Sequence, residues 1–309
     1  MTLDFINVGY GDAILIRSGS FTMLVDCGDW TVGDGGPDSQ RISAADFLRQ
    51  EGIDTLDLLV LTHLHRDHSG GLTELLECVA VRSFRCNYLP DRIFWGKRVP
   101  VPEGFSAGAR CLLESLNVFL SALAIMEQQG TEVSLASPGT WPLTPELTAE
   151  CFLEAQPIFE RQAAIWQNVL EDRADNRELE ELDGFINNTS IRLRLSYAGQ
   201  EIELPGDVYA SCWERHQLPP CTLIKLPHHG HGDALTSRLL EMLRPRYAVI
   251  SVSDDRTDDC PSKKIIQILS QFGVECFFTD AVPCQYAPDQ PHAAIRFRIE
   301  KGVLMVSDV

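Results

Sequence analysis

The sequence of 309 residues has few basic side chains. Lysine and arginine together number 26 against 44 aspartates and glutamates, so the formal net charge is −18. A surface of this charge repels a phosphate backbone at long range, which argues against a broad basic face for nucleic acid. A local phosphate-binding cleft is not excluded, because divalent metal ions can make a small region electropositive.

Long apolar runs and paired cysteines are also missing. The longest apolar runs, such as Leu58–Leu61 and Tyr247–Val252, are far shorter than the roughly 20 residues that span a bilayer, so we expect no membrane contact. The N-terminus has neither the basic nor the apolar region of a signal peptide, which predicts a cytoplasmic protein. No two of the ten cysteines have CxxC spacing, so we expect reduced thiols and no zinc knuckle.

The remaining pattern is that of an α/β protein. Apolar residues make up 44% of the chain, which is enough for a globular core. Strand patterns fill the first quarter, including the buried run Leu56–Leu61, and they return after residue 190 with helical patterns between them. Residues 88–186 are the least regular part, with helices expected at 108–129 and 160–180. Two sets of strands, each followed by helices, predict a four-layer α/β/β/α sandwich.

Three histidines and an aspartate follow directly after the predicted strand at 56–61. The segment from Thr62 to His68 reads THLHRDH. Burying three imidazoles and a carboxylate at a strand end is costly without a partner, and a metal ion removes that cost. In an extended turn His63 and His65 point the same way, whereas Asp67 and His68 can face a second ion about 4 Å from the first. The motif therefore predicts a site for one or two metal ions.

Two later segments supply further candidate ligands. Gly206 and Asp207 end a predicted strand, where the Asp207 carboxylate can bridge two ions through its two oxygens. The segment Pro227–Gly230 reads PHHG and follows another predicted strand, so it brings a further imidazole to a strand end. Imidazoles with carboxylates suit Zn²⁺, and Mn²⁺ is compatible with the same donors.

The order of these segments resembles the metallo-β-lactamase fold superfamily, and within it the hydrolase domain of the ComEC/Rec2 competence proteins and their free-standing relatives. The segments that carry the resemblance are Val8–Ile16, Leu24–Gly28, Thr62–Gly71, Asn187–Leu195, Gly206-Asp207 and Pro227–Gly230. The resemblance covers roughly residues 1–80 and 187–300. It implies one metallo-β-lactamase-like αββα hydrolase domain over 1–309, in which residues 88–186 are a partly helical insertion or cap.

The resemblance also implies a ligand set. The implied metal ligands are His63 and His65 for one ion, Asp67, His68 and His228 for the other, and Asp207 as the bridge. Of the two adjacent histidines we prefer His228, the first residue past the strand and proline, with His229 beside it near the substrate. Asp12 and Asp26 are expected to orient imidazoles or the loop from behind.

Further residues are candidates for catalysis and substrate binding. Asp67 and Asp207 would orient the attacking hydroxide as well as bind metal. His231 stands where relatives have serine, and it would contact a phosphate or donate a proton to the leaving group, or else face solvent. Asn188 and Ser190 would hydrogen-bond a phosphoryl oxygen, or else close the turn before the next strand.

One departure from the superfamily concerns the first ion. Members often have a histidine between the HxHxDH motif and the bridging aspartate, but in this chain no histidine lies between His68 and His216. The competence-type members have Asn-Asn-x-Ser in that region, as this chain does at Asn187–Ser190. The first ion is therefore expected to have fewer ligands from protein.

The function implied is a metal-dependent hydrolase, a phosphodiesterase or nuclease in which a metal-bound hydroxide attacks phosphorus. Two alternatives stay open: a small-molecule phosphodiesterase or esterase, acting on a cyclic nucleotide or a choline-phosphate ester, and a non-catalytic metal-binding module for a protein partner that the sequence does not identify. The acidic chain favours the small-molecule version. Tryptophans of the insertion, such as Trp95, are expected in its core, or one of them stacks on a base.

Overall fold

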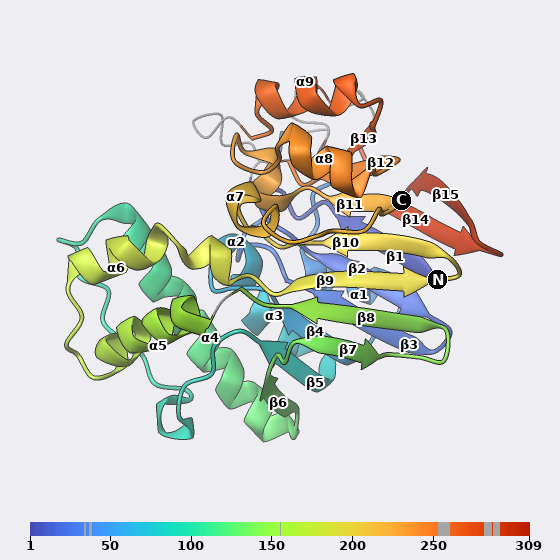
Figure 1. Cartoon of the computed structure of the whole chain (residues 1–309). Helices are drawn as coiled ribbons and strands as arrows, with labels where there is room; N and C mark the ends of the chain where they lie inside the picture. Colours follow the sequence, from blue (N-terminus) through green and yellow to red (C-terminus); the bar gives the residue numbers. More distant parts are fainter. Residues whose placement is uncertain (34, 37–38, 155, 253–259, 281–285, 287–290) are drawn as a thin grey trace.

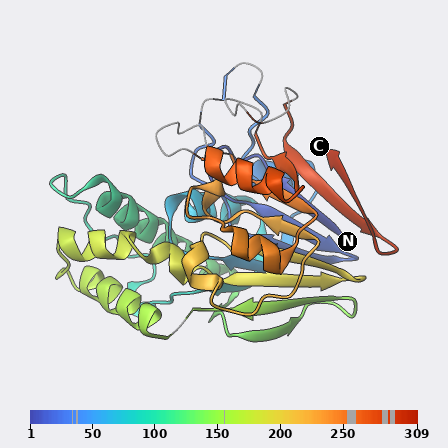
Figure 2. The ribbon, with the colours of Figure 1, turned by 45° about the horizontal axis from the view of Figure 1, so that its top comes forward.

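The computed structural model describes residues 1–309 apart from 34, 37–38, 155, 253–259, 281–285 and 287–290. In the described residues, two mixed sheets lie face to face and helices cover their outer sides, as Figures 1 and 2 show. This arrangement confirms the predicted four-layer sandwich.

The order of strands across each sheet differs from their order along the chain. From one edge to the other, the first sheet comprises β15 (Val303–Asp308), β14 (Ala294–Glu300), β1 (Thr2–Ile6), β2 (Ile14–Ser18), β3 (Phe21–Val25), β4 (Thr55–Leu61), β5 (Ala80–Cys86) and β6 (Glu132–Leu135). The second comprises β13 (Glu275–Phe278), β12 (Tyr247–Ile250), β11 (Leu223–Lys225), β10 (Gln200–Leu204), β9 (Arg192–Tyr197), β8 (Leu147–Phe152) and β7 (Gly139–Pro142).

Side chains that point alternately to the two faces of each sheet form the apolar layers. Leu3 and Phe5 of β1 point into the space between the sheets, where they join Leu193 and Leu195 of β9 in one buried apolar cluster. Ile6 belongs to a second cluster on the outer face of the first sheet. Successive side chains of a strand point to opposite faces, so both faces of β1 are buried and the strand is apolar throughout except at Thr2 and Asp4.

Helices complete the outer layers. Those on the first sheet are α1 (Ala44–Gln50), α2 (Arg66–Ser69), α3 (Leu72–Cys78) and α4 (Ala107–Gln129). Those on the second sheet are α7 (Ala210–Trp213), α8 (Ser237–Leu243) and α9 (Lys263–Gln271). Helix α6 (Asn176–Asp183) packs against α4, and α5 (Gln156–Leu170) packs against α6, at one end of the sandwich (Figure 1).

Helix α4 is the one helix in the described part of the chain that is long and apolar enough to cross a membrane. It packs against α2 and α3, and Leu112, Leu116 and Phe119 are fully buried in the outer cluster of the first sheet. Its apolar composition is therefore explained by packing within the protein.

The region 88–186 contributes to both sheets as well as to the helices. Strands β6, β7 and β8 lie within it as members of the two sheets. The helix expected at 160–180 is two helices, because Asp172 has a positive φ of 57° and Asp175 caps a new helix by accepting from the Glu178 N–H.

Candidate metal centre

Parallel strands bring the candidate ligands to one end of the sandwich. The motif from His63 to His68 follows β4, and α2 forms its second half. Asp207 follows β10 and the segment Pro227–Gly230 follows β11, the parallel neighbour of β10. Because neighbouring parallel strands end at the same edge, the side chains that follow them can meet.

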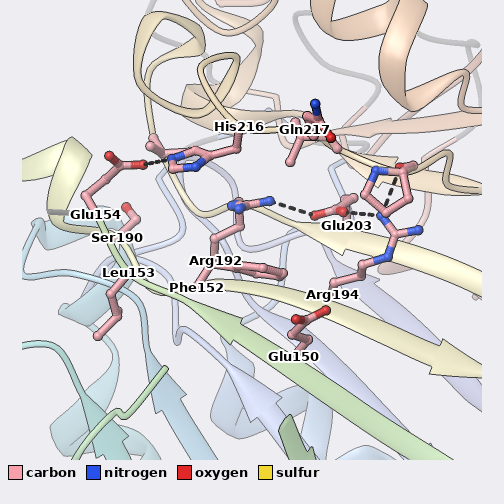
Figure 3. A pocket seen from close by; sticks show the side chains of 13 residues that line it. Glu150, Phe152, Leu153, Glu154, Ser190, Arg192, Arg194, Glu203, His216 and Gln217 are labelled. Atoms are coloured by element: carbon pink, nitrogen blue, oxygen red, sulfur yellow. Dashed lines mark hydrogen bonds and ion pairs between the residues drawn. The ribbon is translucent and has the colours of Figure 1, made fainter. Parts of the chain in front are cut away.

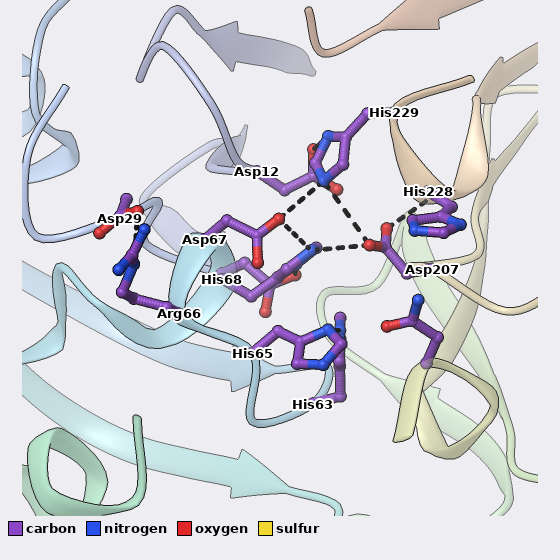
Figure 4. A network of polar contacts seen from close by, with 12 residues as sticks. Asp12, Asp29, His63, His65, Arg66, Asp67, His68, Asp207, His228 and His229 are labelled. Carbon is purple, nitrogen blue, oxygen red and sulfur yellow. Dashed lines mark hydrogen bonds and ion pairs between the residues drawn. The ribbon is translucent and has the colours of Figure 1, made fainter. Parts of the chain in front are cut away.

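Asp67, His68, Asp207 and His229 form a buried cluster (Figure 4). Their candidate ligand atoms all lie within 4.8 Å of one another. His68 Nε2 is 3.1 Å from Asp207 Oδ2, and His229 Nε2 is 2.9 Å from Asp67 Oδ2. Two imidazoles and two carboxylates converging in a buried site match the donor chemistry of a divalent metal ion.

His63 and His65 present a second pair of nitrogens beside this cluster. His63 Nε2 and His65 Nδ1 are 3.2 Å apart, and the His63 ring centroid is 4.2 Å from that of His68. A tetrahedral ion bound at about 2.0–2.1 Å holds its ligand atoms roughly 3.4 Å apart, so this spacing fits two ligands of one ion. Asp183 of α6 lies 3.6 Å from the other nitrogen, His65 Nε2.

The outward nitrogens of two imidazoles are held by other side chains. His68 Nδ1 is 2.8 Å from Asp26 Oδ2, and Asp26 also accepts from the Thr62 N–H. His63 Nδ1 is 3.0 Å from Thr62 Oγ1 and 3.3 Å from Ser190 Oγ. Such contacts fix ring orientation and leave Nε2 for a metal ion, which fits the expected role of Asp26.

Behind His229 lies a buried ion pair. Lys225 is only 1% exposed and pairs with Asp12 Oδ2. The other Asp12 oxygen is 3.8 Å from His229 Nδ1, and both of these buried atoms lack a hydrogen-bond partner. From the sequence, Lys225 ends a strand that leads into the site, and strand alternation is expected to turn its side chain away. A lysine within the apolar segment CTLIKLP is nevertheless a signal, since lysine is almost never fully buried unless paired.

The charges of the cluster depend on one another. Burial opposes protonation of His68, but Asp207, Asp67 and Asp26 outweigh it and raise the pKa of His68 well above its ordinary value. Burial also opposes ionisation of Asp207, yet His68 and His229 hold the pKa of Asp207 well below its ordinary value. For His63, burial and the neighbouring His68 and His65 lower the pKa. Without metal, the raised pKa of His68 and the lowered pKa of Asp207 therefore both favour an ion pair between these two side chains.

The structure reverses the preference between the two adjacent histidines. His229, not His228, reaches the cluster with its ring. Both residues have positive φ, 47° at His228 and 51° at His229, and the turn sends their rings in different directions. His228 contributes its backbone N–H to Asp207 Oδ1, while its Nδ1 is 2.9 Å from Asp233. The ligand proposal below therefore takes His229 in place of His228.

His231 lies at the rim of the site. Its Nδ1 is 3.1 Å from Asp233, its ring centroid is 4.9 Å from that of His228, and its side chain is 40% exposed. His228, His231 and Asp233 thus form a half-exposed group beside the buried cluster. Asp233 was not anticipated from the sequence, and its position two residues after His231 carries no distinctive signal.

Asn188 and Ser190 are engaged with the protein itself. Asn188 Oδ1 accepts from the Tyr209 N–H at 3.0 Å. Ser190 Oγ donates to the Asn187 carbonyl at 2.7 Å and accepts from the Asp207 N–H at 3.1 Å. These contacts match the turn-closing interpretation, and they also tie both residues to the segment that carries Asp207.

A cavity of about 350 Å³ adjoins this segment on the outer face of β8 and β9 (Figure 3). Ser190 is part of its wall, together with Arg192, Arg194 and Glu203. Arg194 binds Glu203 Oε1 at 2.7 Å, whereas Arg192 is 3.7 Å from Glu203 Oε2 and lies over the Phe152 ring. Ser190 connects this cavity to the candidate metal ligands, because its hydroxyl also contacts the His63 ring and the Asp207 N–H.

Comparison with known proteins finds a matching family model and a curated protein of similar sequence. A family model described as the metallo-beta-lactamase superfamily matches residues 6–106. ComE operon protein 3 of Bacillus subtilis (strain 168) is 21% identical over 292 residues, which is 90% of this chain and 32% of that protein. The chain thus spans about a third of the length of this curated relative.

Solved structures share the fold. The metallo-beta-lactamase fold protein YhfI from Bacillus subtilis has a TM-score of 0.52 at 12% identity, covering 90% of this chain and 95% of its own. Igni18, a metallo hydrolase from the archaeon Ignicoccus hospitalis KIN4/I, has a TM-score of 0.50 at 12% identity, covering 97% and 100%. At such identities the likeness concerns the fold, because one fold carries many activities.

Proposed function

We propose that this chain, a metal-dependent hydrolase of the metallo-β-lactamase superfamily with a ComEC-like sequence, cleaves phosphodiester bonds and acts as a nuclease. The observation that carries the proposal is the buried cluster of Asp67, His68, Asp207 and His229. Its donors fit a divalent cation, and the nitrogens of His63 and His65 beside it fit a second. We propose Zn²⁺ as the bound metal, with Mn²⁺ as a substitute.

Bound divalent ions would activate water and offset the charge that builds on phosphoryl oxygens. The protein's own residues orient the reactants. Asp207, fixed by the N–H group of His228 and by the Ser190 hydroxyl, would bridge the two ions. Asp67 faces the same space and would accept a hydrogen bond from the attacking water. His231, with Asp233 against Nδ1, would give a proton to the leaving group.

The proposal also covers the domain organisation around the site and the class of substrate. We propose a single domain in which the helical parts of residues 88–186 cap the ligand end, since α6 brings Asp183 to within 3.6 Å of His65 Nε2. The substrate would be a nucleic acid in the cytoplasm. A small phosphodiester of the cyclic-nucleotide or choline-phosphate type is the second candidate, favoured by the net charge of −18 and by the nearby cavity of about 350 Å³.

A substrate panel tests the proposal. Purified protein loaded with Zn²⁺ or Mn²⁺ is incubated with single- and double-stranded DNA, RNA, cyclic nucleotides, glycerophosphocholine and bis-p-nitrophenyl phosphate. We expect nucleic acid to be cleaved, and we expect Asp207→Ala to abolish cleavage. Asp54→Ala should leave cleavage intact, because Asp54 is exposed and lies at the opposite end of β4 from the metal motif. Cleavage of the small esters alone would favour the second candidate, and a fully metallated protein inert on every compound would contradict both.

A further inference from the structure

An exposed tryptophan lies next to the metal motif. Trp30 is 43% exposed, whereas Trp141, Trp166 and Trp213 are buried. The Arg66 guanidinium covers the Trp30 ring at 4.8 Å from its centroid. An exposed aromatic ring with an arginine on one face can serve as a platform on which a base stacks.

The backbone ties this tryptophan closely to the candidate ligands. Arg66 immediately precedes Asp67 and binds Asp29 Oδ2 at 2.9 Å, and Asp29 Oδ1 accepts from the Trp30 N–H. Residues 27–28 also bond to α2 and its C-terminal end, because the Cys27 N–H donates to the His68 carbonyl and Gly28 accepts from the Gly71 N–H. Figure 4 shows Arg66 and Asp29 on the side of Asp67 away from Asp207.

The space beside Trp30 suits an uncharged ring. An open hollow of about 620 Å³ is bordered by Trp30, Val32, Gln40, Ile42, Ser43 and Glu74. Arg41, which also lines it, is engaged by Asp280 at 2.6 Å, and Asp46 pairs with Arg49, so among the described residues Glu74 is the acid of this wall that has no ion-pair partner. A second phosphate would be repelled at this surface, whereas a polar, neutral base would meet amide and hydroxyl groups.

Trp95, the tryptophan of the insertion considered for stacking, is a weaker candidate. It also has an arginine over its ring, Arg92 at 5.2 Å. However, its Nε1 donates to the Pro90 carbonyl and its ring packs against the apolar core, while Arg92 pairs with Glu127. The two tryptophans therefore form a matched pair, of which only Trp30 adjoins the metal motif.

We infer that Trp30, backed by Arg66, is the platform on which a nucleobase of the substrate stacks beside the candidate metal centre. This inference rests on the proposed phosphodiesterase function and narrows its substrate to nucleotide-containing phosphodiesters. Base–aromatic stacking is worth about 1–3 kcal/mol per base, which corresponds to a roughly 5- to 150-fold contribution to affinity.

Two chromogenic esters with the same leaving group test the inference. Thymidine 5′-p-nitrophenyl phosphate carries a base, and methyl p-nitrophenyl phosphate does not. For the metal-loaded protein we expect a higher kcat/KM for the thymidine ester. Trp30→Leu should lower the ratio of the two kcat/KM values about tenfold, mainly through KM, because it keeps apolar bulk but has no ring face. Trp30→Phe should keep most of the ratio, and the control Trp95→Leu should leave it unchanged.

The outcomes separate the inference from the proposed function. A wild-type protein that hydrolyses neither ester would contradict the phosphodiesterase proposal. If both esters are hydrolysed but Trp30→Leu leaves their ratio unchanged, or Trp30→Phe lowers it as much as Trp30→Leu, stacking on Trp30 is wrong. Calorimetric titration with thymidine 5′-monophosphate gives a readout without turnover, and a tenfold weaker Kd for Trp30→Leu supports the inference.

Discussion

Two groups of histidine and aspartate lie side by side in this molecule, and they differ in what surrounds them. In the buried group, His68 has one nitrogen held by Asp26 and the other among Asp67 and Asp207. In the rim group, His228 and His231 both turn toward Asp233, and all three side chains are partly exposed. Residue type alone does not distinguish the groups. Burial distinguishes the group that is fitted for metal, together with the way Asp26 holds the outward nitrogen of His68.

Metal removal is the strongest way to test this comparison. Chelation should abolish activity and lower Tm, because an ion that binds only the folded state stabilises it. Without metal, His68 has a raised pKa, so its proton contributes stability that is fully present below about pH 6.5 and is lost as pH rises through the higher folded pKa. The lowered pKa of His63 affects stability only below about pH 6.5.

The sign of the pH effect follows from these two shifts. Between pH 7 and pH 9 the metal-free protein should become less stable, and the gain in Tm on adding Zn²⁺ should grow, since metal replaces the lost proton. Calorimetric melting at several pH values, with and without Zn²⁺, measures both trends. A gain that shrinks toward pH 9 would contradict the assignment of His68 to the metal cluster.

The next largest effect distinguishes the adjacent histidines. His229→Asn should lower metal affinity and activity by about a thousandfold, because it removes a buried imidazole from the cluster, whereas His228→Asn should cost less than tenfold. Asparagine is chosen for both because it tolerates the positive φ that each residue adopts. Equal losses in the two variants, by chelator competition and by kcat/KM, would remove the distinction between the buried and rim groups.

This pair also marks how far the sequence could lead. The four candidate ligands between His63 and His68 could be singled out because they lie within six residues after an apolar strand, and Asp207 because it ends another strand. The choice of His229 could not, since it depends on φ angles of 47° and 51° in one turn. The sequence His228-His229 is the same whichever of the two rings faces the cluster.

The fold, too, could be predicted from the sequence only in part. Alternating and continuous apolar runs predicted the layered sandwich, and 108–129 agrees with α4 to within a residue. The helix expected at 160–180 splits because local side-chain capping by Asp175 outweighs its helical pattern. The contacts of Lys225 with Asp12 and of Trp30 with Arg66 join residues distant in sequence, so no local pattern contains them.

Lys225→Met should have an intermediate effect. It leaves Asp12 as an unpaired buried charge behind His229, which should cost about 3–5 kcal/mol of unfolding free energy. Losing this support should also weaken metal binding by about 10- to 100-fold. Urea unfolding in chelator and metal competition measure the two effects. The double variant Lys225→Met with Asp12→Asn should regain part of the stability, and a double variant no more stable than the single one would contradict the pairing.

The smallest effect is expected at the rim. Burial opposes protonation of His228, but its hydrogen bond to Asp233 raises the pKa of His228 and the same contact lowers that of Asp233. The pair therefore contributes stability between about pH 4 and the raised pKa of His228. Because Asp233 is 38% exposed, solvent screening limits this contribution to less than about 1 kcal/mol.

Asp233→Asn should accordingly lower Tm slightly at pH 5.5 and not at pH 9, and it should leave metal content unchanged. Its effect on kcat should be only a few-fold, since it acts through His231 at the mouth of the site rather than on the buried donors. Melting curves at the two pH values, metal analysis and kcat measure these three quantities. Loss of metal from Asp233→Asn would mean that the rim group binds an ion itself. The buried and rim groups would then both be metal sites that differ only in their affinity for the ion.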